Sequence, residues 1–524
     1  MGAMHDSPER VHGFDLDLER NLAAIGSVGS RTARIWLRSE RVQPLKLRLR
    51  ADGFEARHEL SLPRSDATDH TYSIHYPGDL DDAEPLKPNT RYQLRLELDD
   101  GSELTLEFET APEAHDYADP FSIAVISCHQ PFDPRGKLTD EATHFLDKLP
   151  EAFAEHRVKR VLLMGDQIYS DCPTTRSLFD EAYFREVMPD GVSSLFDCTR
   201  EEVRRLYQDR HRLFFSAPGF KRLQEKFPCY PILDDHELRD NFGSATEHHS
   251  ARYAAIKSGA LDAFVDYQAS RLDIPQVRTQ RGYHFEWDYG PVAGFVMDLR
   301  SHKRNDGEHI QLFDSRQLHQ LRAFLERNRT TPAVVLGLSV PLVHIPDWMV
   351  GAAALMLGEQ SDAADRWSYV KAHGARDELF ELLCEHQLAA PKQRLIIAAG
   401  DVHVGVAGLI QVMDTGRKGG VELRMYQLVS SAVSNLESPV KTWAASLLPL
   451  MKRGLSVASD DSPYASRFDL LQGIGASKRN PVPELNAGLI RVDPTPDGYE
   501  VRVQLLAPDR DGKVVEVFSS GALG

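Results

Sequence analysis

Six apolar runs in the second part of the chain constrain its fold more than any other feature of the sequence. Each is apolar through its body, as expected for strands buried on both faces of a sheet, and most end in polar or reactive residues. Between them, segments such as 139–156 and 315–328 have apolar residues at three- and four-residue spacing and predict helices. Strands alternating with helices predict an α/β region with a largely parallel or mixed sheet and helices outside it. The runs cover residues 121–128, 160–167, 229–237, 292–301, 333–340 and 394–403.

Residues with chemical reactivity gather at the ends of these runs. Because ligands in such folds bind beyond the carboxyl ends of the strands, we expect these side chains to converge on one edge. Each one alone has a structural reading, as a turn, a helix cap or a small core residue. The same coincidence at five strand ends favours a shared site instead. The set comprises Cys128, His129, Asp166, Tyr169, Asp234, Asp235, His236, Asp298, Arg300, Asp401 and His403.

Carboxylates, imidazoles, a thiol and a phenol at one edge are together a set of metal donors. Carboxylate oxygens suit Fe(III), Mg, Mn or Ca, imidazole suits Fe, Zn or Mn, and a thiolate adds a soft donor. Asp166, at a strand end, is the natural carboxylate to bridge two cations. The phenol of Tyr169 is more informative, because a group with a pKa of about 10 ionises at neutral pH only beside a strong Lewis acid. Fe(III) is the commonest biological ion of that kind.

The chain divides into two parts that differ in their pattern of apolar and polar residues. Residues 14–112 alternate apolar with polar positions and predict an all-β sandwich of the fibronectin III or immunoglobulin type. In "LKPNTRYQLRLEL", Tyr92 is expected to be a corner tyrosine whose hydroxyl bonds back to the backbone. Residues 118–524 form the predicted catalytic domain, which ends in further alternating strands. Insertions near 346–370 and 437–475 are expected to form lids over the cleft.

Composition excludes several partner classes. A formal net charge of −17 argues against a broad nucleic-acid-binding or anionic-membrane surface, because both require positive charge. The five cysteines show no CxxC pair, so neither a disulfide framework nor a zinc ribbon is predicted. The apolar stretch 348–358 is too short to span a bilayer. The N-terminus lacks the basic and apolar regions of a secretory signal, so a cytoplasmic enzyme is expected, with a mature periplasmic or secreted form as the alternative.

Four short motifs carry a resemblance to a known family. "ISCH", "GDQIYSD", "DDHE" and "GDVHVG", in this order, resemble the PhoD-like alkaline phosphatases and phosphodiesterases of the calcineurin-like metallophosphatase superfamily. That superfamily shows D-x-H, G-D-x-x-D, G-N-H-[DE], a lone His and G-H-x-H, and PhoD-like members modify the motifs as this sequence does. The resemblance extends from about residue 20 to 500. It implies an αββα metallophosphatase sandwich behind the N-terminal β-sandwich.

The resemblance also implies the metals and their ligands. A ferric ion is expected on Cys128, Asp166, Tyr169 and His403. Asp166 is expected to bridge to one or two divalent cations, most of all calcium, with Mg, Mn or Zn as alternatives. Further ligands are expected from the third and fourth motifs and the segment after D-D-H-E, namely Asp235, Asn241 and Asp401.

The predicted reaction is hydrolysis of a phosphomonoester or phosphodiester by attack of a metal-bound hydroxide. Metal ions neutralise the phosphoryl oxygens, lower the pKa of water and align nucleophile and leaving group. No Ser or Thr of the motifs is an obvious nucleophile, so no phospho-enzyme is expected. His236 is the predicted general acid or phosphate donor, oriented by Asp234, and it acts beside Asp235. Arg300 is expected to bind the non-bridging oxygens of a small phosphate ester or a phosphodiester polymer.

Two positions depart from the motifs of the superfamily, and two alternative functions are left open by the sequence. Ser339 stands where the superfamily has its lone His, and His129 follows Cys128 where several relatives carry Gln. Asp171 is expected to be a supporting or helix-capping residue. A purple acid phosphatase would also pair a sandwich with G-D-x-x-Y, but its D-x-G, G-N-H and G-H-x-H motifs do not occur here. The other alternative is a non-catalytic scaffold that retains the fold. The monoester or diester preference and the oligomeric state are left open.

Overall fold

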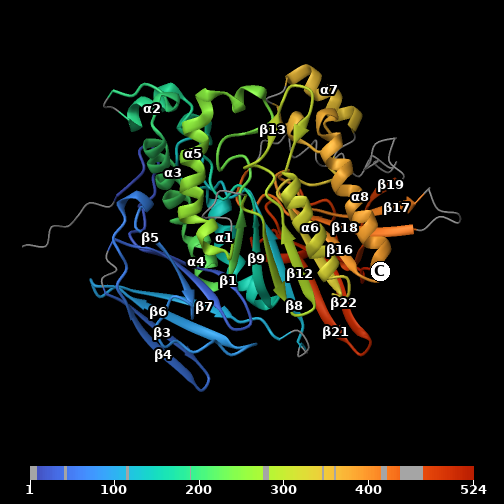
Figure 1. Cartoon of the computed structure of the whole chain (residues 1–524), viewed down its shortest axis with the longest axis horizontal. Helices are drawn as coiled ribbons and strands as arrows, with labels where there is room; N and C mark the ends of the chain where they lie inside the picture. The colour runs from blue at the N-terminus through green and yellow to red at the C-terminus, as the bar shows by residue number, and fades with distance from the viewer. Residues whose placement is uncertain are drawn as a thin grey trace, which may run out of the picture.

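The structure is a computed structural model in which a small β-sandwich precedes two large sheets flanked by helices (Figure 1). It describes residues 9–40, 44–113, 117, 119–188, 191–274, 282–344, 347–358, 361–414, 422–436 and 464–524. The first strand of the predicted catalytic region pairs with one of its late strands in the same sheet.

The N-terminal strands form two antiparallel sheets around a core of their own. The first sheet contains, in spatial order, β1 (Leu22–Val28), β2 (Ala33–Arg38) and β5 (Thr71–Tyr76). The second contains β4 (Phe54–Leu60), β3 (Leu45–Ala51), β6 (Arg91–Glu97) and β7 (Glu103–Glu109). Every second residue of β6 is buried, as the alternating pattern predicted.

Tyr92, near the start of β6, has the predicted corner geometry. Its hydroxyl accepts a hydrogen bond from the backbone N–H of Lys87 at 2.8 Å, and its ring is 1% exposed. The bond ties the incoming loop to the strand, which is the structural role expected of a corner tyrosine.

Fourteen of the remaining described strands form two seven-stranded sheets. All six predicted apolar runs are strands, three in each sheet. The first sheet contains, in spatial order, β10 (Cys229–Ile232), β9 (Val158–Met164), β8 (Phe121–Ile126), β21 (Ala487–Thr495), β22 (Gly498–Pro508), β23 (Val514–Ser520) and β20 (Gly473–Lys478). The second contains β11 (Phe285–Tyr289), β12 (Val292–Val296), β15 (Ala333–Leu338), β16 (Arg394–Ala399), β18 (Glu422–Val429), β17 (Val406–Asp414) and β19 (Tyr464–Leu470). A two-stranded ribbon pairs β13 (Arg304–Asn305) with β14 (Ile310–Gln311).

The two sheets pack face to face with helices outside, which confirms the αββα prediction. Along β15, Val335 belongs to the core shared with the first sheet, whereas Val334 and Leu336 belong to the core beneath the outer helices. That alternation is possible only for a strand buried on both faces. The helices are α1 (Asp140–Glu155), α2 (Glu181–Val187), α3 (Arg200–Phe215), α4 (Pro218–Lys226) and α5 (Ala254–Tyr267) around the first sheet, and α6 (Ser315–Arg327), α7 (Asp347–Leu357) and α8 (His373–Ala389) on the side of the second.

Parallel pairing sets where the strand ends fall. β8, β9 and β10 run parallel in the first sheet, and β12, β15, β16 and β18 run parallel in the second. The late strands β21 to β23 extend the first sheet in antiparallel pairing beside β8. The carboxyl ends of the parallel strands therefore lie on one edge of each sheet.

The two expected insertions have different outcomes. The first contains α7 and a 3-10 turn, η8 (Asp362–Asp365). Of the second, residues 437–463 lie outside the described residues. Its last part, 464–475, does not form a lid, because it contains β19 and the start of β20, which pair at the edges of the two sheets. The alternating pattern of "YASRFDL" is the physical reason, since it suits an edge strand.

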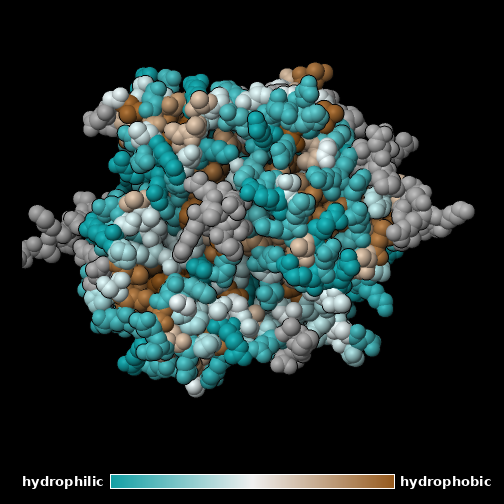
Figure 2. Space-filling view, in the orientation of Figure 1, coloured by the Kyte–Doolittle hydropathy of each residue, from teal (hydrophilic) through white to brown (hydrophobic). Residues whose placement is uncertain are grey.

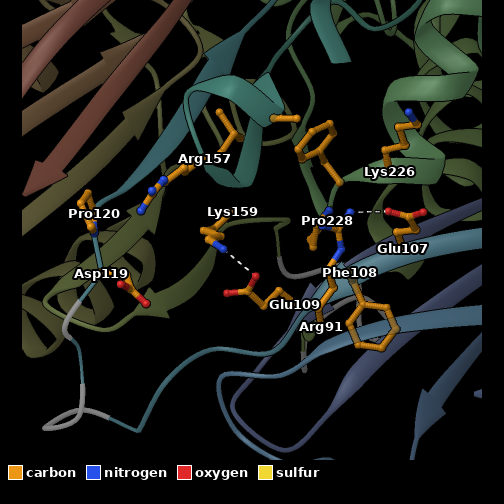
Figure 3. Close-up of a pocket in the computed structure, with 13 residues that line it drawn as sticks. Arg91, Glu107, Phe108, Glu109, Asp119, Pro120, Arg157, Lys159, Lys226 and Pro228 are labelled. Atoms are coloured by element: carbon orange, nitrogen blue, oxygen red, sulfur yellow. Dashed lines mark hydrogen bonds and ion pairs between the residues drawn. The ribbon is translucent and has the colours of Figure 1, made fainter. Parts of the chain in front are cut away.

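The sandwich is fixed to the catalytic region at the opposite edge from these strand ends. Arg160, on β9, donates to the carbonyl oxygens of Val28 and Glu109, and Lys159 forms an ion pair with Glu109 at 2.5 Å. A cavity of about 380 Å³ lies at this junction (Figure 3). Because it is lined by the N-terminal ends of β9 and β10, it is separate from the predicted site.

Most of the visible surface is hydrophilic, as the charged composition predicts (Figure 2). A hydrophobic spot lies at the end of the molecule where α7 projects, and Leu355 and Met356 of α7 are 88% and 78% exposed. Within the described ranges, none of the helices combines the length and hydrophobicity needed to cross a membrane.

Candidate metal centre

The predicted site residues meet beyond the carboxyl ends of the parallel strands, between the two sheets. Oxygen atoms of Asp166, Asp234, Asp235 and Asp401 lie within 4.8 Å of one another, although these residues follow β9, β10 and β16. The sequence prediction that strand ends from distant parts of the chain converge is therefore confirmed for these four residues.

Two glycines allow the strand ends to approach so closely. A Cβ on Gly165 would lie 2.4 Å from Cβ of Asp234, and one on Gly400 would lie 2.5 Å from Oγ of Ser127. Neither distance is tolerable for a real side chain. Each glycine comes directly before a predicted metal ligand, so the glycine of the "GD" motifs is a packing requirement of the centre.

The backbone is strained where the predicted ligands stand. Of the ten non-glycine residues with positive φ in the described part of the chain, five are predicted metal ligands: Cys128, Asp166, Asn241, Asp401 and His403, with φ between 54° and 68°. Left-handed backbone is unfavourable for most L-residues, and least so for Asn and Asp. Such residues cluster at functional sites, where the surrounding structure holds them. The backbone strain is thus a second feature, besides the side-chain chemistry, that indicates a functional site at this edge.

The first donor group contains the residues implied for a ferric ion. One donor atom each from Cys128, Asp166 and His403 lies within 4.8 Å of the others. Sγ of Cys128 is 3.3 Å from Oδ2 of Asp166, and the hydroxyl of Tyr169 is 3.4 Å from the same oxygen. Asp166 thus stands between a thiol and a phenol, as its predicted position in the cluster requires.

Two residues that follow β18 contact the donors of this first group. They were not predicted from the sequence. Oγ of Ser431 lies 3.1 Å from Sγ of Cys128 and accepts the backbone N–H of His403 at 3.0 Å. The side-chain amide of Asn435 donates to the hydroxyl of Tyr169 at 3.2 Å. The polar segment that follows the strand-like stretch 422–429 was the available sequence signal.

The second donor group is the four carboxylates, with Asp166 common to both groups. Oδ2 of Asp234 and Oδ1 of Asp235 are buried and have no hydrogen-bond partner within the described part of the chain. The guanidinium of Arg300 forms a long ion pair with Oδ1 of Asp235, at 3.8 Å, beyond hydrogen-bond distance. Buried carboxylate oxygens without partners are unfavourable, and a hard cation would satisfy them. The residues present therefore fit a divalent cation beside the first group.

Burial shifts the pKa values of the donor groups in the direction expected for acids. It raises the pKa of Asp166 well above its usual range, and the nearby Asp235 adds to this. Burial likewise raises the pKa of the Cys128 thiol and of the Tyr169 phenol. The cluster therefore needs added positive charge to hold these groups ionised, which is what metal ions provide.

His236 is oriented by a different carboxylate from the one predicted. Its Nδ1 lies 2.7 Å from Oδ1 of Asp171, and Oδ2 of Asp171 accepts the backbone N–H of Asp240 at 2.5 Å. Asp234, the predicted partner, instead binds Arg300 and accepts from Oγ of Ser339 at 3.0 Å. The prediction for Asp234 was wrong because its side chain points toward Arg300 and Ser339 and not toward His236. Burial opposes the charge of His236, but the surrounding carboxylates, above all Asp171, outweigh it and raise its pKa.

Arg300 forms ion pairs with acidic residues of the centre. It is 1% exposed, pairs with Asp234, and binds Asp365 through both terminal nitrogens, one of them at 2.7 Å. Lys303 also pairs with Asp365. Direct contact of Arg300 with a phosphoryl oxygen, as predicted, would require these ion pairs to open. In its observed position, Arg300 instead holds the carboxylates of Asp234 and Asp365 in place.

The insertion around η8, which was expected to lie over the cleft, reaches into the centre with side chains that were not predicted to belong to it. Besides Asp365, it supplies Asp362, which accepts from the side-chain amide of Asn241 at 3.1 Å. It also supplies Arg366, which forms an ion pair with Asp401. The backbone N–H of Asn241 donates to Oδ2 of Asp235 at 2.5 Å. Two predicted ligands, Asn241 and Asp401, therefore contact the insertion directly.

Glu237, which is not a predicted ligand, connects the loops after β9 and β10 through hydrogen bonds. Its buried carboxylate accepts the backbone N–H groups of Asp166 at 3.0 Å, Gln167 at 2.7 Å and Asp234 at 2.8 Å. Burial raises its pKa to about 7, against the lowering effect of these bonds. Its place as the last residue of "DDHE" was a signal that could have been used.

Two residues of the converging set have structural roles. His129 uses both ring nitrogens, at 2.9 Å from Oγ of Ser434 and 3.1 Å from the carbonyl oxygen of Phe214, so it is turned away from the donors. Asp298 accepts the backbone N–H groups of Arg300 and Ser301, at 3.0 and 2.9 Å. It shapes the turn after β12.

Known proteins resemble this chain in sequence family and in fold. A family model described as PhoD-like phosphatase matches residues 123–453, more than half of the chain. A solved structure of PhoD covers 96% of this chain and 92% of its own length, with 14% identity and a TM-score of 0.56. A 5'-nucleotidase from Candida albicans covers 69% of this chain and 52% of its own, with 11% identity and a TM-score of 0.27, too low to support any argument. The search of curated proteins gave no match.

The fold and the site together define a phosphatase-type hydrolase that acts on phosphate esters. The chain belongs to the PhoD-like phosphatase family. This confirms the resemblance drawn from the four motifs, and neither the purple acid phosphatase nor the non-catalytic scaffold is retained.

Proposed function

We propose that this protein hydrolyses phosphate esters, monoesters or diesters, in a metal-dependent reaction. Cys128, Asp166, Tyr169 and His403 would hold Fe(III). Asp166, Asp235 and Asp401, together with Asn241, would hold one or two divalent cations, calcium foremost. The observation that carries the proposal is Asp166, whose carboxylate is shared by a group with thiol, phenol and imidazole donors and a group of carboxylates.

Bound metal ions would neutralise the phosphoryl oxygens and activate the attacking water. The protein supplies the proton for the leaving group. Nδ1 of His236 is fixed by Asp171, so Nε2 is the atom that can donate a proton to the ester oxygen. Asp171 holds the imidazole in the required tautomer and orientation. Arg300 and Asp365 hold Asp234 beneath the site.

Arg366 is a candidate phosphate ligand that the sequence did not reveal. Its side chain is 13% exposed, whereas Arg300 and Lys303 are buried and bound to Asp365. In the structure it neutralises Asp401, a predicted ligand of the divalent cation. A cation on Asp401 would compete with the guanidinium, which would then be available to a phosphoryl oxygen beside it.

We predict opposite effects of Arg366→Ala on two equilibria. Binding of inorganic phosphate should weaken by about tenfold and KM should rise more than kcat falls, because a charge-assisted contact is lost. Binding of calcium should tighten, because Asp401 loses its competing partner. Calorimetric titration of each ligand separates the two, and Arg366→Lys should recover part of the phosphate affinity. Unchanged phosphate binding in Arg366→Ala would remove Arg366 from the substrate site.

The test of the proposed function is metal removal and restoration. Chelation should reduce hydrolysis of p-nitrophenyl phosphate and bis-p-nitrophenyl phosphate by about a thousandfold, because the metals supply several kcal/mol of transition-state stabilisation. Activity should return with ferric iron and calcium together, and metal analysis should find both in the active protein. Full activity in metal-free protein would contradict the proposal. The ratio of the two rates gives the monoester or diester preference.

A further inference from the structure

A second cluster with metal-binding chemistry lies directly beside the centre. One donor atom each of Asp171, Cys172 and His236 lies within 4.8 Å of the others. All three side chains are partly exposed, in contrast to the buried Cys128 and Asp166. The reaction described above uses His236 and Asp171 but has no role for Cys172.

Two of the three donors are already fixed in place. Oδ1 of Asp171 is 2.7 Å from Nδ1 of His236, and its other oxygen accepts the backbone N–H of Asp240 at 2.5 Å. Cys172 is the next residue of the same loop. Zn–N and Zn–O bonds of about 2.0–2.2 Å place two tetrahedral ligands about 3.4 Å apart, so Asp171 and His236 need to separate by less than about 1 Å. The cluster can therefore close on an ion without a change of fold.

The donor set selects the kind of ion. A thiolate, an imidazole and a carboxylate are the donors of zinc sites with one position left for water. Calcium and magnesium take oxygen ligands and gain little from a thiolate. The carboxylates of Asp166, Asp235 and Asp240 around His236 add negative potential that attracts a cation. A soft divalent ion is thus favoured here over the hard cations proposed for the main centre.

We propose that Asp171, Cys172 and His236 form an inhibitory site for zinc-class divalent cations. Binding would form bonds from the metal to the sulfur, a ring nitrogen and a carboxylate oxygen. It would release to solvent the thiol proton of Cys172 and the proton shared by His236 and Asp171. Inhibition follows because zinc on Nδ1 separates the imidazole from Asp171, which holds it in the orientation needed to protonate the leaving group, so this step rests on the proposed function.

The experiment uses the full-length, metal-loaded enzyme freed of excess metal. Added zinc should inhibit hydrolysis, and metal analysis after gel filtration should show one additional zinc per chain with the resident metals retained. Cys172→Ser should have the same activity without zinc but require at least about tenfold more zinc for inhibition, since loss of even an outer partner of a metal weakens binding 10- to 100-fold. Cys198→Ser, a cysteine at the end of another turn, is the matched control and should respond like the parent protein.

Cadmium gives a readout that does not depend on activity. It binds the same donors, and its thiolate-to-metal absorption should be lost in Cys172→Ser and kept in Cys198→Ser. Equal zinc sensitivity of Cys172→Ser and the parent protein, an unchanged cadmium band, or zinc uptake matched by loss of a resident metal would each overturn the proposal. A protein inactive before zinc is added would contradict the proposed function alone, because the metal analysis and the cadmium band would still report on the site.

Discussion

Asp166→Asn should lower hydrolysis by at least about a thousandfold and leave the protein folded. The carboxylate is shared by both donor groups, so an amide there removes a charge from two predicted metal sites at once. Asn also suits the backbone, because φ at residue 166 is 59° and Asn tolerates this region nearly as well as Asp. Since burial disfavours the charged form of Asp166, the neutral amide should not reduce the free energy of unfolding of the metal-free protein.

Steady-state kinetics, metal analysis and urea unfolding together check this prediction. Asp82→Asn is the matched control, because Asp82 has φ of 55° but is exposed on the sandwich. It should keep full activity and full metal content. Near-normal activity in Asp166→Asn would show that the shared carboxylate holds no metal that matters to the reaction.

Tyr169→Phe should remove a visible absorption band and reduce activity by about a hundredfold. The band is expected because a phenolate bound to Fe(III) gives a ligand-to-metal transition, which phenylalanine cannot provide. The aromatic ring would still stack against His236, whose ring centroid is 4.1 Å away, so packing is preserved. The loss of activity reflects a weaker hold on the metal by the remaining donors.

Tyr207→Phe is the control for this change. Tyr207 is equally buried, and burial raises its pKa as it does that of Tyr169, but its hydroxyl donates to the carbonyl oxygen of Leu238 at 2.5 Å. Its replacement should leave the band intact. A colourless parent enzyme that is active without iron would assign the first group to a different cation.

The fold and the main donors follow from local sequence features. Six apolar runs with polar ends predict parallel strands, and parallel pairing places Asp166 and Asp235 at the same edge of the first sheet. Asp401 follows β16 in the second sheet and reaches the same site because the two sheets pack face to face. The corner tyrosine Tyr92 likewise depends on a short segment, and its hydrogen bond to Lys87 spans five residues. Predictions of this kind succeed because they need only the pattern of one strand and its turn.

The supporting residues depend on long-range packing and were missed for that reason. Ser431 and Asn435 reach Cys128 and Tyr169 only because β18 pairs with β16 in the second sheet. Arg366 reaches Asp401 because the insertion folds back over the strand ends. The orientation of His236 by Asp171 brings together residues that are 65 positions apart. No periodicity or motif spacing in the sequence encodes these contacts.

The carboxylate of Glu237 has a consequence for the motions of the centre. Three backbone amides, from the loops after β9 and β10, share this single buried acceptor. Opening either loop breaks bonds that also hold the other, so the two loops move and unfold locally as one cooperative unit. Asp166 on the first loop and Asp234 and Asp235 on the second therefore change position together. A centre in which only one of the two loops is in place is not a favoured intermediate.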